Sequence, residues 1–207
     1  MTEKVSPKTC RGVRRGERLT NCSHDRCGRR YNAFTLIELI VVVGLIIVLA
    51  GLVLSTVGYA RKKGARARAE TEIAAMSAAC ENYKADNGVY PANSDTNALN
   101  AQTSVNPSAY QAASLYLYNA LFGATAGSRT PNTGARSYFV FKPNMLFPAD
   151  QTQAVLYIQD PFGNSYGYST IQAATQDTTK GYNPTFDLWS TASGTTIGDA
   201  PKWIKNW

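Results

Sequence analysis

The stretch FTLIELIVVVGLIIVLAGLVLSTVGYA, residues 34–60, decides the fold. Its polar side chains between residues 34 and 57 are Thr35, Glu38, Ser55 and Thr56. As a helix, residues 34–57 extend roughly 36 Å at 1.5 Å per residue, against a hydrocarbon core of about 30 Å. Leu, Ile and Val occur on every side of that helix, unlike the one-sided pattern of a soluble core helix. The stretch therefore predicts a single membrane span over residues 34–57.

Glu38 is the exception in this stretch, because it lies four residues inside the apolar edge. An ionised carboxylate at that depth costs several kcal/mol unless it is neutralised or paired, so an intramembrane acid is first interpreted as functional. The alternative is that Glu38 lies at the depth of the membrane interface and is merely tolerated there. The stretch alone leaves both interpretations open.

Residues 33–40, AFTLIELI, follow a basic leader and open the apolar helix. This string resembles the class III signal of type IV pilins and type II secretion pseudopilins, although the family usually has Gly where this chain has Ala33. The resemblance implies that a prepilin peptidase cuts between Ala33 and Phe34 and that the new amino terminus of Phe34 is methylated. It also implies that Glu38 pairs with an amino terminus during assembly.

The charge of the chain is concentrated in residues 1–33, which we expect to be a cytoplasmic leader that is cleaved. The whole chain has a formal net charge of +7, but the leader holds nine of its 21 Lys and Arg residues and three of its 14 acids. The mature chain is therefore close to neutral, and the basic pI does not indicate nucleic-acid binding. Cys10, Cys22, His24 and Cys27 of the leader match no strong zinc-finger spacing.

A basic cluster follows the span, at Arg61, Lys62, Lys63, Arg66 and Arg68. Lys and Arg counts on the two sides are too similar to orient the span. The resemblance places the leader in the cytoplasm and the rest of the chain in the periplasm of a bacterium, anchored in the inner membrane. The cluster then lies at the outer headgroup surface, where anchoring is a simpler interpretation than DNA contact.

The hydrophobic pattern becomes one-sided beyond this cluster. Ile73, Met76, Cys80 and Tyr83 are spaced as on one face of a helix, which predicts one continuous helix over residues 34–84 whose second half is amphipathic. Gly88 can end that helix in a left-handed conformation. The remainder, residues 85–207, is predicted to be one globular head.

Within this head we expect a helix over residues 108–122, capped by Ser108 and ended by Gly123. Apolar and aromatic runs between Pro, Gly and Asn turns predict strands at residues 138–142, 154–159, 166–170 and 186–190 of an antiparallel sheet. The predicted fold class is α+β: a long N-terminal helix packed on a small antiparallel head, as in pilins.

Three further strings extend the resemblance to the G-type major pseudopilin of type II secretion. They are YKADNGVYP at residues 83–91, DPFGNSYGY at 160–168 and FDLWS at 186–190. The family binds calcium in the loop after the last of these strands, which implies a calcium site at Asp187, Ser193 and Asp199 here. Ca²⁺ takes six to eight oxygen ligands and this loop is poor in carboxylates, so a plain loop held by Trp203 and Trp207 is the alternative.

The sequence does not indicate an enzyme. It has no phosphate-binding loop or nucleophile motif, and its single His, His24, lies in the leader. The resemblance implies a structural subunit of a helical homo-oligomeric filament, the secretion pseudopilus, with minor pseudopilins, an inner-membrane assembly platform and the prepilin peptidase as partners. The alternatives are a type IV pilin for adhesion, motility or DNA uptake, and a membrane-tethered binding module that keeps its leader.

Overall fold

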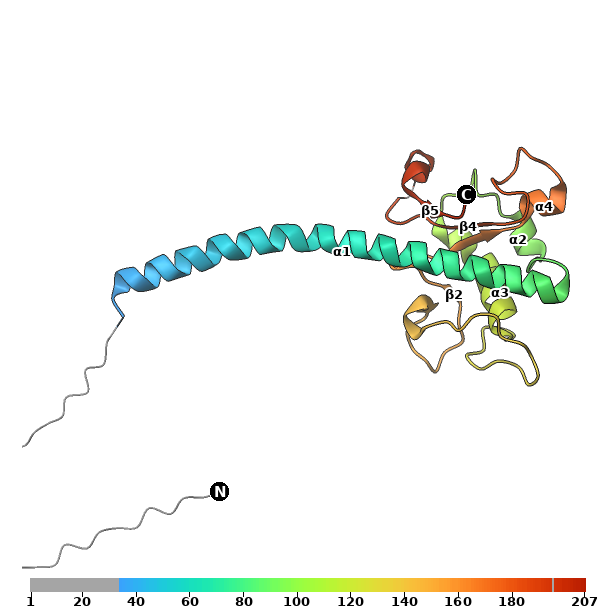
Figure 1. Cartoon of the computed structure of the whole chain (residues 1–207), viewed down its shortest axis with the longest axis horizontal. Helices are drawn as coiled ribbons and strands as arrows, with labels where there is room; N and C mark the ends of the chain where they lie inside the picture. Colours follow the sequence, from blue (N-terminus) through green and yellow to red (C-terminus); the bar gives the residue numbers. More distant parts are fainter. Residues whose placement is uncertain (1–33, 195) are drawn as a thin grey trace, which may run out of the picture. The chain divides into compact units, whose positions relative to one another are not determined.

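The computed structural model describes residues 34–194 and 196–207, apart from the side chains of residues 55, 56 and 197. The chain divides into two compact units, residues 1–47 and residues 48–207. Figure 1 shows the order of the elements along the chain. The predicted cleavage residue Ala33 and the Cys and His residues of the leader lie outside the described residues.

The first helix, α1, runs over Leu36–Asn87 without interruption. It ends at Gly88, which has a φ of +77° and donates its N–H to the Lys84 carbonyl at 2.7 Å. Glycine adopts this left-handed conformation without steric cost, which explains why the helix ends here. The predicted long N-terminal helix is therefore confirmed, with its end three residues later than expected.

Six helices and strands lie between α1 and β3 (Gly167–Ser169), the first strand of the last sheet. In chain order they are α2 (Ser94–Ala98), η1 (Pro107–Tyr110), α3 (Gln111–Phe122), η2 (Pro143–Met145), β1 (Leu146–Phe147) and β2 (Tyr157–Ile158), and α4 (Ile171–Thr175) follows β3. The helical segment before α3 is capped by Asn106, which accepts the Ser108 N–H, so the predicted cap at Ser108 is wrong by two residues. Gly123 ends α3 in the left-handed conformation, as predicted.

The sheets are small and antiparallel. β1 pairs with β2, and β3 (Gly167–Ser169) pairs with β4 (Asp187–Ser190), which in turn pairs with β5 (Ile204–Lys205). η3 (Ile197–Lys202) connects the last two strands. The α+β fold class with a long first helix and a small antiparallel sheet is thus confirmed.

The second half of α1 covers the main core of the head. Ile73, Met76 and Cys80 are at most 3% exposed, and they belong to one cluster with residues of α3 and the sheets, including Leu117 and Leu188. Burial raises the pKa of the Cys80 thiol to about 12, so this cysteine is a small core residue and not a reactive one.

A predicted strand at residues 138–142 does not form. Tyr138 and Phe139 both donate their backbone N–H groups to the Leu121 carbonyl, at 2.7 and 3.1 Å. That carbonyl belongs to the last turn of α3, where helical carbonyls have no partner within their own helix. The segment therefore completes a helix end, while its aromatic residue Phe141 packs into the core.

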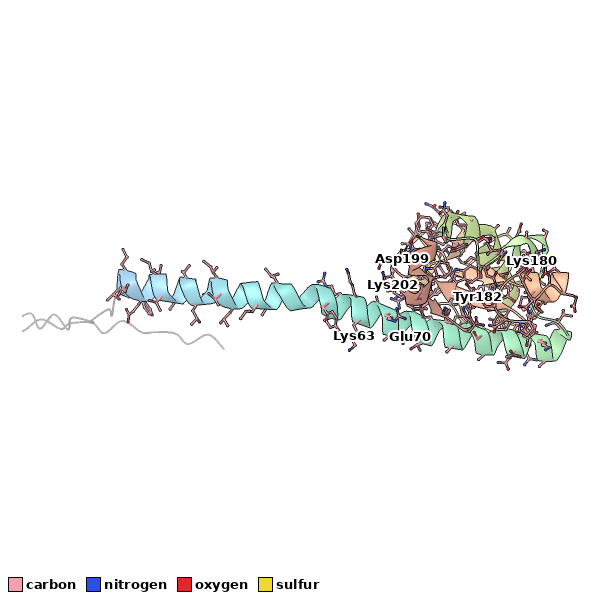
Figure 2. The ribbon with its side chains drawn as sticks, turned by 90° about the horizontal axis from the view of Figure 1, so that it is seen from above. Lys63, Glu70, Lys180, Tyr182, Asp199 and Lys202 are labelled. Atoms are coloured by element: carbon pink, nitrogen blue, oxygen red, sulfur yellow. The ribbon has the colours of Figure 1, made fainter. Side chains whose placement is uncertain are left out.

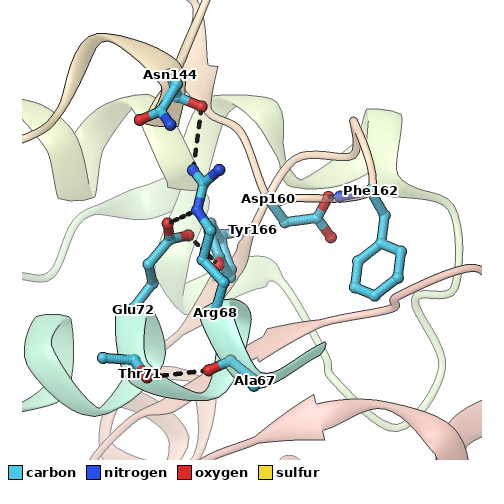
Figure 3. Close-up of polar contacts among 8 residues, drawn as sticks. All are labelled: Ala67, Arg68, Thr71, Glu72, Asn144, Asp160, Phe162 and Tyr166. Carbon is cyan, nitrogen blue, oxygen red and sulfur yellow. Dashed lines mark hydrogen bonds and ion pairs between the residues drawn. The ribbon is translucent and has the colours of Figure 1, made fainter. Parts of the chain in front are cut away.

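The buried carboxylate of Glu72 connects α1 to Tyr166, the residue just before β3, as Figure 3 shows. Glu72 is 9% exposed and accepts from the Arg68 guanidinium at 2.6 Å and from the Tyr166 hydroxyl at 2.7 Å. Arg68 also reaches the Asn144 carbonyl at 3.5 Å. Burial raises the pKa of Tyr166, so this phenol stays neutral and remains a donor to Glu72. This carboxylate thus joins α1 to Tyr166 of the head.

Tyr166→Phe is expected to lower the free energy of unfolding by about 1 to 3 kcal/mol. The substitution keeps the aromatic ring but removes the hydroxyl that donates to a buried oxygen of Glu72. The matched control is Tyr116→Phe, since the Tyr116 hydroxyl donates to a neutral carbonyl, that of Ala92, at 2.9 Å and in a more exposed position. Denaturant unfolding of both variants measures the difference. Equal losses would show that Glu72 does not depend on Tyr166.

Candidate functional site

Glu38 lies at the start of α1 and closes a capping box with Thr35. The Thr35 N–H and hydroxyl both donate to Glu38 Oε2, at 2.9 and 2.8 Å, and the Glu38 N–H donates to Thr35 Oγ1 at 3.3 Å. These reciprocal bonds satisfy amide groups that a helix start leaves without partners. Glu38 therefore has a local role in starting the helix, besides any role in assembly.

This local role of Glu38 was not predicted, although the spacing of Thr35 and Glu38 in the sequence indicates it. Thr, two residues and Glu at the start of an apolar run is the pattern of a capping box. The stretch from residue 31 to residue 60 contains no Lys or Arg, so a cation for Glu38 cannot come from this part of the same helix. An external amino terminus fits this chemistry, because a positive partner lowers the cost of placing a carboxylate in a low-dielectric medium.

The first part of α1 exposes apolar side chains all round. Ile37, Ile40 and Leu45 are each more than half exposed, and so is Ile47 at 66%. α1 contains a window long and apolar enough to cross a membrane, and none of that window is buried within the described protein. Water is an unfavourable solvent for such a surface, at roughly 25 cal/mol per Å² of apolar area. An exposed apolar surface of this kind favours lipid or other apolar chains around the helix.

The basic cluster after the apolar stretch contains both paired and unpaired cations. Arg66 contacts Glu70 at 3.1 Å and Arg68 contacts the buried Glu72. Among the described residues, Arg61, Lys62 and Lys63 have no ion pair, and all three are exposed. The cluster thus supplies free positive charge immediately beyond the apolar stretch, as expected for an anchor at a headgroup surface.

The three residues predicted to bind calcium have different surroundings. The oxygens of Asp187 accept the backbone N–H groups of Tyr182 and Asn183, at 2.9 and 2.8 Å. Burial raises the pKa of Asp187, and those two N–H bonds oppose the shift. This carboxylate, on the first residue of β4, holds the turn at residues 182–187, and each of its oxygens accepts one backbone N–H.

Asp199 and Ser193 line one pocket, and Asp187 is not among the residues that line it. Asp199 accepts from the Thr196 hydroxyl at 2.7 Å and the Lys202 ammonium at 3.0 Å, contacts that lower its pKa. Among residues 34–194 and 196–207, no group of three or more His, Cys, Asp or Glu side chains could hold a metal ion. The arrangement described does not assemble a calcium shell, and calcium binding stays a prediction of the resemblance.

The turn at residues 160–164 forms part of the wall of that pocket, through Phe162. Asp160 Oδ1 accepts the N–H groups of Phe162 and Asn164, at 2.9 and 2.8 Å, and its other oxygen accepts from the Ser190 hydroxyl in β4. Asn164 in turn donates to the Ala192 carbonyl at 2.7 Å. Burial raises the pKa of Asp160. The acid of this turn is therefore structural, because both of its oxygens are used to join the turn to β4.

Comparison with known proteins finds similarity to one secretion component. The chain is 36% identical over 69 residues to the type II secretion system core protein G of Pectobacterium carotovorum subsp. carotovorum. The match covers 33% of this chain and 44% of that protein, which is less than half its length. Neither a protein-family model nor a solved structure matches the chain. Together with the long apolar helix and the small antiparallel sheet, this similarity supports the G-type pseudopilin family of type II secretion that the sequence motifs indicate.

Proposed function

We propose that the chain is a structural, non-catalytic subunit of a type II secretion pseudopilus, a helical filament that assembles from the inner membrane. The observation that carries the proposal is the first part of α1, which exposes apolar side chains on every side and carries one acid, Glu38, at its start. Lipid covers this surface before assembly, and the helices of other copies cover it in the filament. The similarity to a core protein of type II secretion supports this assignment.

Maturation prepares the chain for that change of surroundings. The prepilin peptidase cuts between Ala33 and Phe34 and removes the basic leader, and methylation of the Phe34 amine follows. The head lies in the periplasm, and the inner-membrane assembly platform and minor pseudopilins are the partners of assembly. The amino terminus of one copy then lies close to the Glu38 carboxylate of another.

The reason for this pairing is electrostatic. A carboxylate that leaves the membrane interface for the interior of a helical bundle loses solvation, and the loss costs several kcal/mol unless an opposite charge offsets it. An amino terminus supplies the charge without adding a cation to the apolar stretch. Thr35 holds the Glu38 carboxylate at the helix start, at 2.8 Å, so the acid is oriented before its partner arrives.

Variants at Glu38 and Thr35 separate the charge from the helix cap. Glu38→Gln keeps an oxygen that can accept from Thr35 but removes the charge, so membrane insertion and leader cleavage should persist while filaments are lost. Thr35→Val removes both contacts of the Thr35 hydroxyl but keeps the backbone N–H bond to Glu38 and the acid itself, so filaments should form. Filament shearing with electron microscopy measures assembly, and membrane fractionation is the control.

The opposite pattern would overturn this assignment. Normal filaments from Glu38→Gln, or from the more apolar Glu38→Leu, would show that the acid is only tolerated at the interface. Loss of filaments from Thr35→Val with normal filaments from Glu38→Gln would show that the helix cap is what matters.

Ala33→Leu should block leader cleavage, because a peptidase cleft that accepts a small residue beside the scissile bond excludes a bulky one. Phe34→Leu is the matched control, since it changes the other side of the bond and keeps an apolar residue, and it should still be cut. Intact-mass measurement of the membrane fraction gives the cleaved and uncleaved masses. Mature chain from Ala33→Leu would show that the cleavage site is assigned wrongly.

A further inference from the structure

A pocket of about 560 Å³ lies where α1 passes the loop between β4 and η3. From α1 it is lined by Tyr59, Lys62, Lys63 and Arg66, and Lys202 approaches from the end of η3. Residues spaced by three, four and seven along a helix share one face, which is why these four side chains of α1 reach the same pocket. Figure 2 shows Lys63 on α1 next to the end of the head that carries Asp199 and Lys202, with Lys180 toward the other end.

The pocket is strongly basic. Four cations, at Lys62, Lys63, Arg66 and Lys202, line it with a single carboxylate, Asp199. Arg66 is also paired with Glu70, so the uncompensated positive charge is that of Lys62 and Lys63. Asp199 offsets Lys202, with which it makes an ion pair at 3.0 Å. Like charges gathered in one concave place repel each other and favour an anion.

Arg66 and Lys202 are held by contacts within the protein, whereas Lys62 and Lys63 are available to a ligand. Arg66 donates to the Lys202 carbonyl at 2.7 Å, so it ties α1 to the loop that forms the opposite wall. Lys62 and Lys63 are exposed and have no ion pair within the described part of the chain. The pocket therefore has a wall held in place by Arg66 and two unpaired ammonium groups, and ammonium groups make strong charge-assisted hydrogen bonds to phosphate.

The depth of the pocket relative to the apolar stretch identifies the source of the phosphate. Tyr59 and Lys63 lie two and six residues beyond Val57, or roughly 3 and 9 Å along a helix, which is the depth of the polar headgroup layer. Tyr59 is 71% exposed, and aromatic residues are common at this depth. Phe162 adds a second aromatic wall.

We propose that this pocket binds the phosphate of an anionic phospholipid headgroup, with Lys62 and Lys63 as its ligands and Tyr59 and Phe162 against the glycerol. The inference rests on the membrane span of the proposed function but not on filament assembly. Its consequence is that the lipid seats the head on the membrane in one orientation before assembly. Extraction of the subunit into a filament would then require release of this lipid.

The test uses the full chain in a non-ionic detergent and counts bound lipid by native mass spectrometry. The probes are dioleoyl phosphatidylglycerol, dioleoyl phosphatidylcholine and inorganic phosphate. We expect saturable binding of phosphatidylglycerol, weaker binding of phosphatidylcholine, and no competition from phosphate at equal concentration. A competing phosphate would reassign the pocket to a free anion and overturn the lipid proposal.

Matched charge variants test the place of binding. Lys63→Gln should weaken phosphatidylglycerol binding about five-fold, and Lys62→Gln/Lys63→Gln about thirty-fold, from about 1 kcal/mol per basic residue near an anionic lipid at 1.4 kcal/mol per tenfold. Arg61→Gln removes the same charge from a residue that does not line the pocket, so its effect should be clearly smaller.

Equal losses from Lys63→Gln and Arg61→Gln would show attraction by the whole cluster and overturn the site. Loss of filaments from Lys63→Gln with lipid binding unchanged would assign the pocket to a neighbouring subunit instead. Neither result would affect the Glu38 assignment, which is measured by filament formation in a chain whose pocket is intact.

Discussion

The need to cover the apolar surface of α1 is the constraint on which the rest of the structure depends. In its second half that surface is a stripe, and the head covers it with Leu117, Leu188 and their neighbours. In the first part the surface extends all round the helix and remains exposed in the isolated chain. Burial of apolar area is the main favourable term in folding and association, so an uncovered helix of this length indicates a lipid or subunit environment.

Polar contacts also join the elements that this apolar packing brings together. Glu72 accepts from Arg68 and Tyr166 and so joins α1 to the head, while Asp160 joins the turn at residues 160–164 to β4. Each of these carboxylates is buried, and both of its oxygens accept from donors of the same chain. Free charge is found instead on the face of α1 that carries Lys62 and Lys63, next to the apolar stretch.

The long helix was predicted correctly because it is determined by residues that are close together in the sequence. The apolar run, the spacing of Ile73, Met76 and Cys80 and the turn at Gly88 together identified the long helix. The segment at residues 138–142 was predicted wrongly because its N–H groups bond to the carbonyl of Leu121, a tertiary contact. β5 was missed because it is two residues long and exists through its pairing with β4. The basic pocket could not be found from sequence, because it joins residues 59–66 to residues 192–202.

The central claim is that copies of this helix cover one another in a filament, and disulfide cross-linking tests it directly. Each chain would carry cysteines at both Ile47 and Leu54, which are exposed, with the leader cysteines replaced by Ser, so that one copy can bond to two neighbours. Cys80 remains silent, since burial raises its thiol pKa to about 12. Under oxidation the sheared filament fraction should give a ladder of covalent oligomers. A sheared fraction that contains the protein only as monomer would contradict the account, because the apolar helix would then be covered by something other than its own copies.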